Sequence, residues 1–385
     1  MKELFANPKD YFDNIRKHKN IIMFGAGSKA QQVIKLLENL KIFPCEICDN
    51  SEALQGEKFM GKYVIKSHKE IREKYESYCI LITTTITNAM SIYDSLEKAG
   101  EKHPIYHVCN FFKVDEEFLK YEDVINDEKY KKIYDLLEDE TSKNIFVKNV
   151  NAKMTGNGLP LHDEMCGESF FDEVLLRRTK TDVYVDVGAY TGDTLLQFLQ
   201  FCRGKYQKVY AMEPDQGNYL SLQKFINFGA IKNIEAFNMG GWNEAGEKEF
   251  FSTSNNENVN YDSPNLFQNI SKTLANSEAG MCQKENSVAV SYKVKLDSVD
   301  HIVKDSNASI IKINALAADM PILEGCKETI LRAKPVIVME YGVRPSYMTE
   351  EPIWLDALNV GYKIFMRQKN IFGDCKTLLY AISEW

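Results

Sequence analysis

The stretch VYVDVGAYTGDT, from Val183 to Thr194, combines residue types and spacing that are typical of a cofactor-binding loop. An apolar run contains Asp186, and Gly188 and Gly192 follow before a helical pattern begins. A glycine-rich turn between a strand and a helix places free backbone N–H groups where they can bind an anionic group. Tyr190 occupies the position at which a dinucleotide loop needs its second glycine. We therefore predict a cofactor that has no pyrophosphate.

A second acid follows at the end of the next expected strand, because Glu213 closes the apolar run in KVYAMEPD. A carboxylate at this point can accept hydrogen bonds from both hydroxyls of a ribose. S-adenosylmethionine has a ribose, a carboxylate suited to helix-end amides, and cationic groups that favour nearby acids and carbonyls. We predict that it is the cofactor. A nucleotide-type sheet with an empty site stays open as the alternative.

A different loop lies near the start of the chain, in IIMFGAGSKA. Gly25, Gly27 and Ala30 fit the pattern G-x-G-x-x-G/A, and Asp49 ends the next expected strand, where an acid would hold ribose hydroxyls. The pattern predicts a Rossmann-like domain that binds a nucleotide or a nucleotide sugar. A docking domain with an empty loop is an equally weighted alternative.

Two segments show alternating strand and helix patterns, which predict parallel sheets covered by helices on both faces. We expect an α/β protein with two doubly wound Rossmann-like domains, residues 1–112 and 158–385. The polar, acid-rich residues 113–157 are expected to form a helical connector. Residues 252–288, rich in Asn and Ser, interrupt the second domain and predict either a surface insertion or a lid over the substrate.

Composition and charge limit the classes of partner, cellular location and metal site that remain open. The formal net charge is −8, which disfavours a general attraction for nucleic acid or anionic membranes. The charged start of the chain is unlike a signal peptide, and no apolar run approaches the length of a membrane span. Nine scattered cysteines suggest reduced thiols and a cytoplasmic location. Cys45 and Cys48 form a lone CxxC on an expected strand, so we predict no metal site.

From about Leu136 onward the chain resembles the FkbM-type methyltransferases. The resemblance rests on ordered matches, which are LLEDETSKNIF, FFDEVLL, VYVDVGAYTGDT, KVYAMEPDQGNYLSL, MGGWNEAGEKEFF, VKLDSVD, ILEGCKETILRAKPVIVMEY and the closing YKIFMRQ and TLLYA. It implies a class I methyltransferase fold, S-adenosylmethionine as donor, and O-methylation of a hydroxyl on a sugar, nucleotide sugar or glycoconjugate precursor. It leaves room for a homo-oligomer. The residues before it resemble the nucleotide-binding sheet that precedes such domains in some bacterial sugar-modifying proteins.

The resemblance also assigns residues to the donor site. Those of the loop and the following strand end are Asp186, Gly188, Ala189, Tyr190, Gly192, Asp193, Thr194, Glu213 and Pro214. Those expected near the adenine are Asn238, Gly240 and Trp242.

One segment departs from the family pattern. The family typically reads I-K-M-D-I-E-G-A-E after its fourth strand, whereas this chain reads IIKINALAADM, with Asn314 and Leu316 in place of two acids and Asp319 further on. We expect Asn314 to end a strand and Ala315 to begin a helix. Asn314 can orient a hydroxyl but cannot act as a base. The acceptor site is therefore either reshaped for another substrate or impaired.

Methyl transfer to a hydroxyl needs alignment and gains from a base that removes the proton. The candidates are His162, Asp319 and Glu340, beside Asn314, although residues of these types at such positions are more often ordinary polar surface or strand-end residues. We expect transfer that needs no metal. Two other functions stay open, namely an oxidoreductase or epimerase that uses the N-terminal loop, and a binding protein that has kept the fold without catalysis.

Overall fold

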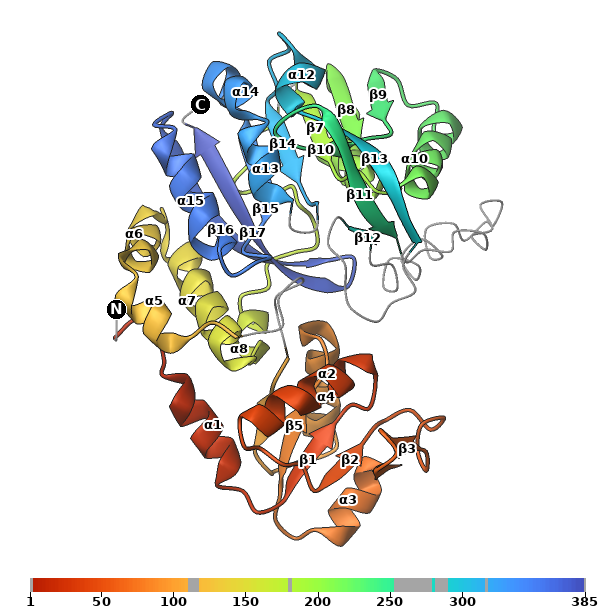
Figure 1. Cartoon of the computed structure of the whole chain (residues 1–385), viewed down its shortest axis with the longest axis vertical. Helices are drawn as coiled ribbons and strands as arrows, with labels where there is room; N and C mark the ends of the chain where they lie inside the picture. Colours follow the sequence, from red (N-terminus) through yellow and green to blue (C-terminus); the bar gives the residue numbers. More distant parts are fainter. Residues whose placement is uncertain are drawn as a thin grey trace. The chain divides into compact units, whose positions relative to one another are not determined.

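The computed structural model describes residues 3–109, 118–178, 182–252, 279–280, 290–315 and 318–383 (Figure 1). Contacts within the chain divide these residues into two compact units. The first, here called the N-terminal unit, holds residues 3–109, 118–131 and 143–165. The second, the C-terminal unit, holds residues 132–142 and the described residues from 166 to 383. The residues of the expected connector are thus shared between both units.

The N-terminal unit contains a six-stranded sheet in the order β3-β4-β2-β1-β5-β6. All neighbouring pairs are parallel except the β3–β4 hairpin, which the sequence patterns did not predict. The strands are β1 (Ile21–Phe24), β2 (Glu46–Cys48), β3 (Lys58–Phe59), β4 (Tyr63–Lys66), β5 (Cys79–Ile82) and β6 (Ile105–His107). Every residue of β1 and β5 is buried, which explains why these two strands read as uninterrupted apolar runs.

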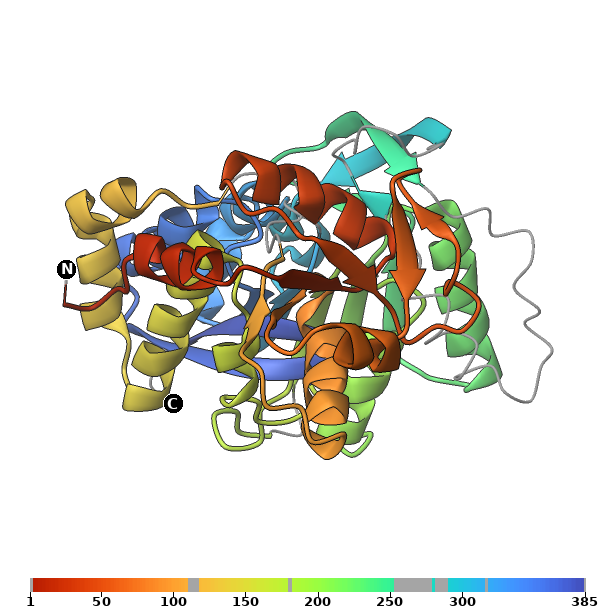
Figure 2. The ribbon, with the colours of Figure 1, turned by 90° about the horizontal axis from the view of Figure 1, so that it is seen from below.

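Helices cover both faces of this sheet, as Figure 2 shows for α2 on one face and α3 with α4 on the other. The helix α1 begins where the side chain of Asn7 accepts the N–H of Lys9, and Ser67 with Glu70 forms a capping box at α3. The helices are α1 (Pro8–Arg16), α2 (Ser28–Asn39), α3 (His68–Lys74), α4 (Ile86–Lys98), α5 (Tyr121–Asn126), α6 (Glu128–Leu136), α7 (Glu140–Thr155) and α8 (Leu159–His162). The last part of α6 and the start of α7 belong to the C-terminal unit.

The C-terminal unit is built on a seven-stranded sheet in the order β16-β17-β15-β14-β7-β8-β9. The five strands from β15 to β9 are parallel, and β17 is antiparallel to both of its neighbours. The strands are β7 (Val183–Val187), β8 (Lys208–Met212), β9 (Ile234–Phe237), β14 (Ile310–Ile313), β15 (Val336–Glu340), β16 (Tyr362–Ile371) and β17 (Asp374–Ser383). The chain runs outward from β7 to β9 and then returns to β14 on the other side of β7 (Figure 1), so the strand order reverses there.

The core of this unit holds aromatic side chains from the first strand and the helix after it. Tyr184 and Phe198 stack with ring centroids 4.4 Å apart, and Phe171 lies against both. The helices are α9 (Asp193–Phe201), α10 (Gln216–Phe228), α12 (Val299–Val303), α13 (Asp319–Glu324), α14 (Lys327–Ala333) and α15 (Tyr347–Ala357). Gly229 caps the end of α10, as its sequence predicts.

A second, smaller sheet belongs to the same unit and was not predicted. Its order is β10-β13-β11-β12, and β11 and β13 form a long antiparallel pair. The strands are β10 (Gly240–Gly241), β11 (Gly246–Ser252), β12 (Ala279–Gly280) and β13 (Val290–Asp297). The insertion expected over residues 252–288 lies almost entirely outside the described residues.

The predicted α/β class is confirmed, since both units are built on doubly wound sheets whose central strands are parallel. Within the described part of the chain, every helix is too short or too polar to cross a membrane.

Candidate functional site

The site is centred on the carboxyl ends of β7 and β14, where an open α/β sheet binds its ligands because the connections diverge. Gly188 follows β7 with φ +78°, a backbone conformation that favours glycine. A Cβ at this position would overlap the carbonyl oxygen of Asn314, which follows β14. Gly188 thus permits the close approach of the two strand ends.

The loop after Gly188 folds back on the next strand. The N–H groups of Gly188 and Ala189 both donate to the carbonyl of Met212 at 3.0 Å. Gly192 has φ +99°, and a Cβ there would press on the side chains of Phe225 and Leu222 in α10. Gly188 and Gly192 are therefore both required by the local geometry. Helix α9 starts at the next residue, so its first N–H groups face the same loop.

Glu213 follows β8, and its carboxylate accepts two backbone hydrogen bonds. Oε2 accepts the N–H of Tyr190 at 2.8 Å, and Oε1 accepts the N–H of Asp215 at 2.9 Å. The residue is only 5 % exposed, and this burial raises the pKa of its carboxyl group to about 7, despite the two bonds. The Asn218 side chain also hydrogen-bonds this carboxylate. A carboxylate has about four acceptor sites, so it can still accept a hydroxyl donor.

Neighbouring side chains fix the turn that carries Glu213. Asn238 donates from Nδ2 to the carbonyls of Glu213 and Pro214, at 3.0 and 3.1 Å. Asp215 caps α10 and accepts the hydroxyl of Tyr292 in β13 at 2.6 Å. Asn238 thus supports the strand end, and Tyr292 and Asp215 are supporting residues that the sequence patterns did not reveal.

Gly240 and Trp242 lie at the base of the smaller sheet. A Cβ at Gly240 would be 2.8 Å from Leu296 and 3.6 Å from the Pro214 side chain, so the chain passes close to the Glu213 turn. The ring of Trp242 packs on the cluster that contains Leu296, and Nζ of Lys248 lies 3.5 Å from its centroid.

Asp186 is fully buried, and both of its carboxylate oxygens have partners within the protein. Oδ1 accepts Nζ of Lys312 at 3.0 Å, and Oδ2 accepts the hydroxyl of Thr194 at 2.7 Å. The resemblance places Asp186 and Thr194 in the donor site. In the structure their side chains bind each other beneath the loop, within the protein interior. Lys312 was missed, although a lysine inside the apolar run IIKI opposite the acid of VYVDV was a visible signal.

Asp193 is the first residue of α9 and is partly buried. Burial raises the pKa of its carboxyl group to about 6, although the nearby Lys312 ammonium acts in the opposite direction. A carboxylate here adds negative charge beside the loop.

The candidate catalytic residues fall in both units. Glu340 ends β15 and pairs with Nζ of Lys376 at 2.7 Å. Asp319 is buried at the start of α13, and Asn314 is half-buried directly after β14. His162 ends α8 in the N-terminal unit. The C-terminal unit thus brings three of the four candidates to segments that follow β14 and β15.

One boundary differs from the expectation. Helix α13 begins at Asp319, whereas the sequence predicted a start at Ala315. Pro321 favours the later start, because proline has no N–H and fits the first turn of a helix better than its interior. Leu316, which would make the pocket wall more apolar if it faced inward, lies outside the described residues.

The N-terminal loop has a related geometry. Gly25 has φ +110°, and Oδ2 of Asp49 accepts the N–H of Ala26 at 2.8 Å. Gly27 caps α2, and Ala30 is buried against the sheet, as the predicted fingerprint requires. The oxygens of Asp49 thus hold this loop, since Oδ1 also accepts the N–H of Ser51 at 2.9 Å.

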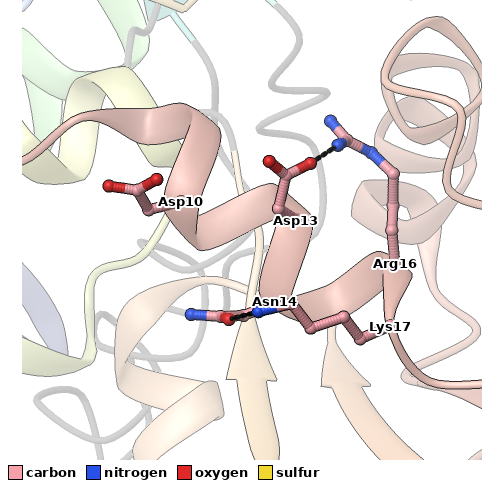
Figure 3. A pocket seen from close by; sticks show the side chains of 5 residues that line it. All are labelled: Asp10, Asp13, Asn14, Arg16 and Lys17. Carbon is pink, nitrogen blue, oxygen red and sulfur yellow. Dashed lines mark hydrogen bonds and ion pairs between the residues drawn. The ribbon is translucent and has the colours of Figure 1, made fainter.

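A surface hollow in the N-terminal unit is lined by five side chains of α1 and the residue after it, which are Asp10, Asp13, Asn14, Arg16 and Lys17 (Figure 3). Asp13 pairs with Arg16, and Lys17 donates to Asn14 at 2.8 Å. Four of these side chains thus pair with one another on a single helix, and the hollow includes none of the candidate residues.

Residues of the kind that bind metals do not gather within the described ranges, where no group of three or more His, Cys, Asp or Glu side chains could hold an ion. Metal independence stays a prediction.

Comparison of sequences gives no match to any family model and none to a curated protein. Comparison with solved structures does give matches. The fold is that of a methyltransferase: the chain matches the FkbM methyltransferase of Methylobacillus flagellatus with a TM-score of 0.69 and 16% identity, over 99% of this chain and 95% of that one. The resemblance predicted from the sequence is thus confirmed at the level of the fold.

Two further matches are weaker. A rRNA methylase from Streptococcus thermophilus matches over 54% of this chain and 90% of its own, with 15% identity and a TM-score of 0.32. A putative methyltransferase from Streptococcus mutans, solved with S-adenosylhomocysteine, covers the same shares with 9% identity and a TM-score of 0.29.

Proposed function

We propose that the protein is an S-adenosylmethionine-dependent O-methyltransferase. The observation that carries the proposal is the carboxylate of Glu213, buried at the end of β8 and held against the loop by the N–H of Tyr190. A buried acid with spare lone pairs suits a pair of ribose hydroxyls. Gly188, which has no Cβ, lets the carbonyl of Asn314 after β14 lie directly against the loop that follows β7.

The residues divide the work of donor binding. Glu213 accepts the ribose hydroxyls, and the first N–H groups of α9 attract the donor's carboxylate. Asp193 supplies negative charge for the cationic amine or sulfonium. The donor itself supplies an activated methyl group, so the protein must mainly align the two reactants.

For the acceptor we propose a hydroxyl on a sugar, nucleotide sugar or glycoconjugate precursor. We expect it to be received by residues at or beyond the carboxyl ends of β14 and β15, namely Asn314, Asp319 and Glu340. Asn314 can orient the hydroxyl. A carboxylate that accepts its proton, acting as general base, would raise the rate about 10²–10⁴-fold. Glu340 has Lys376 as a counter-ion, with Nζ of the lysine 2.7 Å from Oε2.

Transfer of a labelled methyl group tests this function. Wild type should methylate at least one member of a nucleotide-sugar panel, detected by mass spectrometry, and Glu213→Ala should lose activity at low donor concentration. Glu235→Ala, which removes an exposed acid paired with Lys208 on the neighbouring strand, serves as the control. Donor binding without transfer to any acceptor would instead favour the impaired-enzyme alternative.

The N-terminal loop supports a second proposal, that this unit binds a nucleotide or nucleotide sugar. Asp49 closes its loop as Glu213 closes the other. Gly27→Ala is a selective test, because a Cβ there meets nothing within 4 Å and should leave folding intact. It should weaken nucleotide-sugar binding measured by calorimetry and leave donor binding unchanged. If the wild-type chain binds no nucleotide, the docking alternative holds, and a change in nicotinamide fluorescence on mixing would point to redox chemistry.

A further inference from the structure

The buried lysine of the C-terminal unit has a geometry that the activity alone does not explain. Lys312 lies in β14, directly opposite Asp186 of β7 in the parallel register, and it is 0 % exposed. Its Nζ donates to three acceptors, which are Oδ1 of Asp186 at 3.0 Å, the carbonyl of Gly188 at 2.8 Å and Oγ1 of Thr194 at 3.4 Å. An ammonium has three N–H groups, so these contacts use its full capacity.

The three acceptors bracket the donor loop. Asp186 lies in the strand before the loop, Gly188 is its first residue, and Thr194 is in the first turn of α9 after it. Thr194 also donates to Asp186, so one buried network ties both ends of the loop together. Phe170 closes the network on one side, with its ring centroid 5.4 Å from Nζ.

We infer that Lys312 is the positioning residue of the donor loop. By binding the carbonyl of Gly188 it orients that peptide, and the loop that follows then presents the N–H of Tyr190 to Glu213. By pairing with Asp186 it also offsets the one acid of the loop that is fully buried. The inference rests on the proposed function, because it assigns Lys312 a part in donor affinity.

Two ligands of different charge separate positioning from simple electrostatics. S-adenosylmethionine carries a cationic sulfonium, whereas S-adenosylhomocysteine has a neutral thioether. If Lys312 acted only through its charge, its removal would favour the cationic ligand relative to the neutral one. A positioning residue, once removed, weakens both ligands together.

The experiment uses the full chain with Lys312→Met and the double variant Lys312→Met/Asp186→Asn. Lys369→Met is the matched control, because Lys369 is also buried and binds one carboxylate, of Asp172 at 2.7 Å, and one carbonyl, of Cys166 at 3.0 Å. We expect Lys312→Met to weaken both ligands about 10- to 100-fold, the range of a lost charged hydrogen bond. The double variant should recover Tm, because no charge is left unpaired, but should not recover affinity. Lys369→Met should lower Tm and leave affinity unchanged.

Hydrogen exchange of the ligand-free protein gives an independent measurement. Amides of residues 188–194 should exchange faster in both Lys312 variants than in wild type and in Lys369→Met. The inference would be overturned if the double variant had the affinity and the exchange rates of wild type. It would also be overturned if Lys312→Met bound the cationic ligand more tightly, relative to the neutral one, than wild type does. If wild type binds neither ligand, the proposed function fails, while the exchange comparison still decides whether Lys312 holds the loop.

Discussion

The backbone N–H of Tyr190 donates to Oε2 of Glu213 over 2.8 Å. The N-terminal unit repeats this relationship, because the N–H of Ala26 donates to Oδ2 of Asp49 over the same distance and the same separation of 23 residues. In both cases the acid that follows the second strand closes the loop that follows the first. The acid therefore has two roles: it shapes its loop, and it offers its remaining lone pairs to a ligand.

Donor affinity should depend on pH through Glu213. Burial raises the pKa of this carboxyl group to about 7, so it is protonated below that value and accepts hydrogen bonds poorly. We predict that the affinity for S-adenosylhomocysteine rises as the pH increases from 6 to 8. Calorimetry across this range measures the effect, and Glu213→Gln should give a weaker and flatter profile. A wild-type profile as flat as that of Glu213→Gln would contradict the assignment.

Gly188→Ala should abolish donor binding. The added Cβ overlaps the carbonyl of Asn314, and φ +78° adds backbone strain of roughly 1–3 kcal/mol. Urea unfolding should show a marked loss of stability, and calorimetry no donor binding. The control is Gly246→Ala in the same unit, where a Cβ meets nothing within 4 Å. Equal stability of the two variants would show that the close approach of the strand ends is not required.

The loss of folding stability at acidic pH should depend on Glu101 in the N-terminal unit. Its side chain is 2 % exposed, and although burial alone would raise its pKa, hydrogen bonds from Tyr78, His103 and His68 lower it to about 2. A lowered acid pKa stabilises the fold above the unfolded value of about 4.5 and loses this effect as the pH falls towards 2.

Glu101→Gln should therefore cost roughly 1–3 kcal/mol at neutral pH. The difference in unfolding free energy between variant and wild type should shrink as the pH falls below 4.5. A difference that stays constant between pH 7 and 3 would rule out this linkage.

Methyl transfer should survive chelation. Asn314 stands where the family pattern has an acid, so the segment after β14 is a poorer site for a divalent cation. Activity and donor affinity should be unchanged by EDTA. Activity that is lost on chelation and restored by an added divalent metal would contradict this expectation, and so would a metal requirement in wild type that Asn314→Asp strengthens.

Local patterns predicted the main sheet of each unit, because alternating apolar runs and helical periodicity are short-range signals. Each glycine loop lies within about two dozen residues of its own acid, which is Asp49 for the first loop and Glu213 for the second. Both acids were predicted at the ends of their strands. The segment IIKINALAADM was predicted less well, since Pro321 delays the helix to Asp319.

What the sequence did not reveal depends on residues far apart in the chain. Lys312 and Asp186 are 126 residues apart and meet only because β14 inserts beside β7. Tyr292 reaches Asp215 from a second sheet that no periodic pattern indicated. Asp186 was predicted in the donor site, but the sequence did not reveal that its two oxygens pair with Lys312 and Thr194.

Calorimetric titration of the full chain with S-adenosylhomocysteine at pH 8 tests the central claim most directly. The account predicts one site per chain in wild type, a loss of about 1–3 kcal/mol in Glu213→Ala through the lost ribose hydrogen bonds, and wild-type affinity in Glu235→Ala. Absence of measurable binding at millimolar ligand, or equal affinity of Glu213→Ala and wild type, would contradict it.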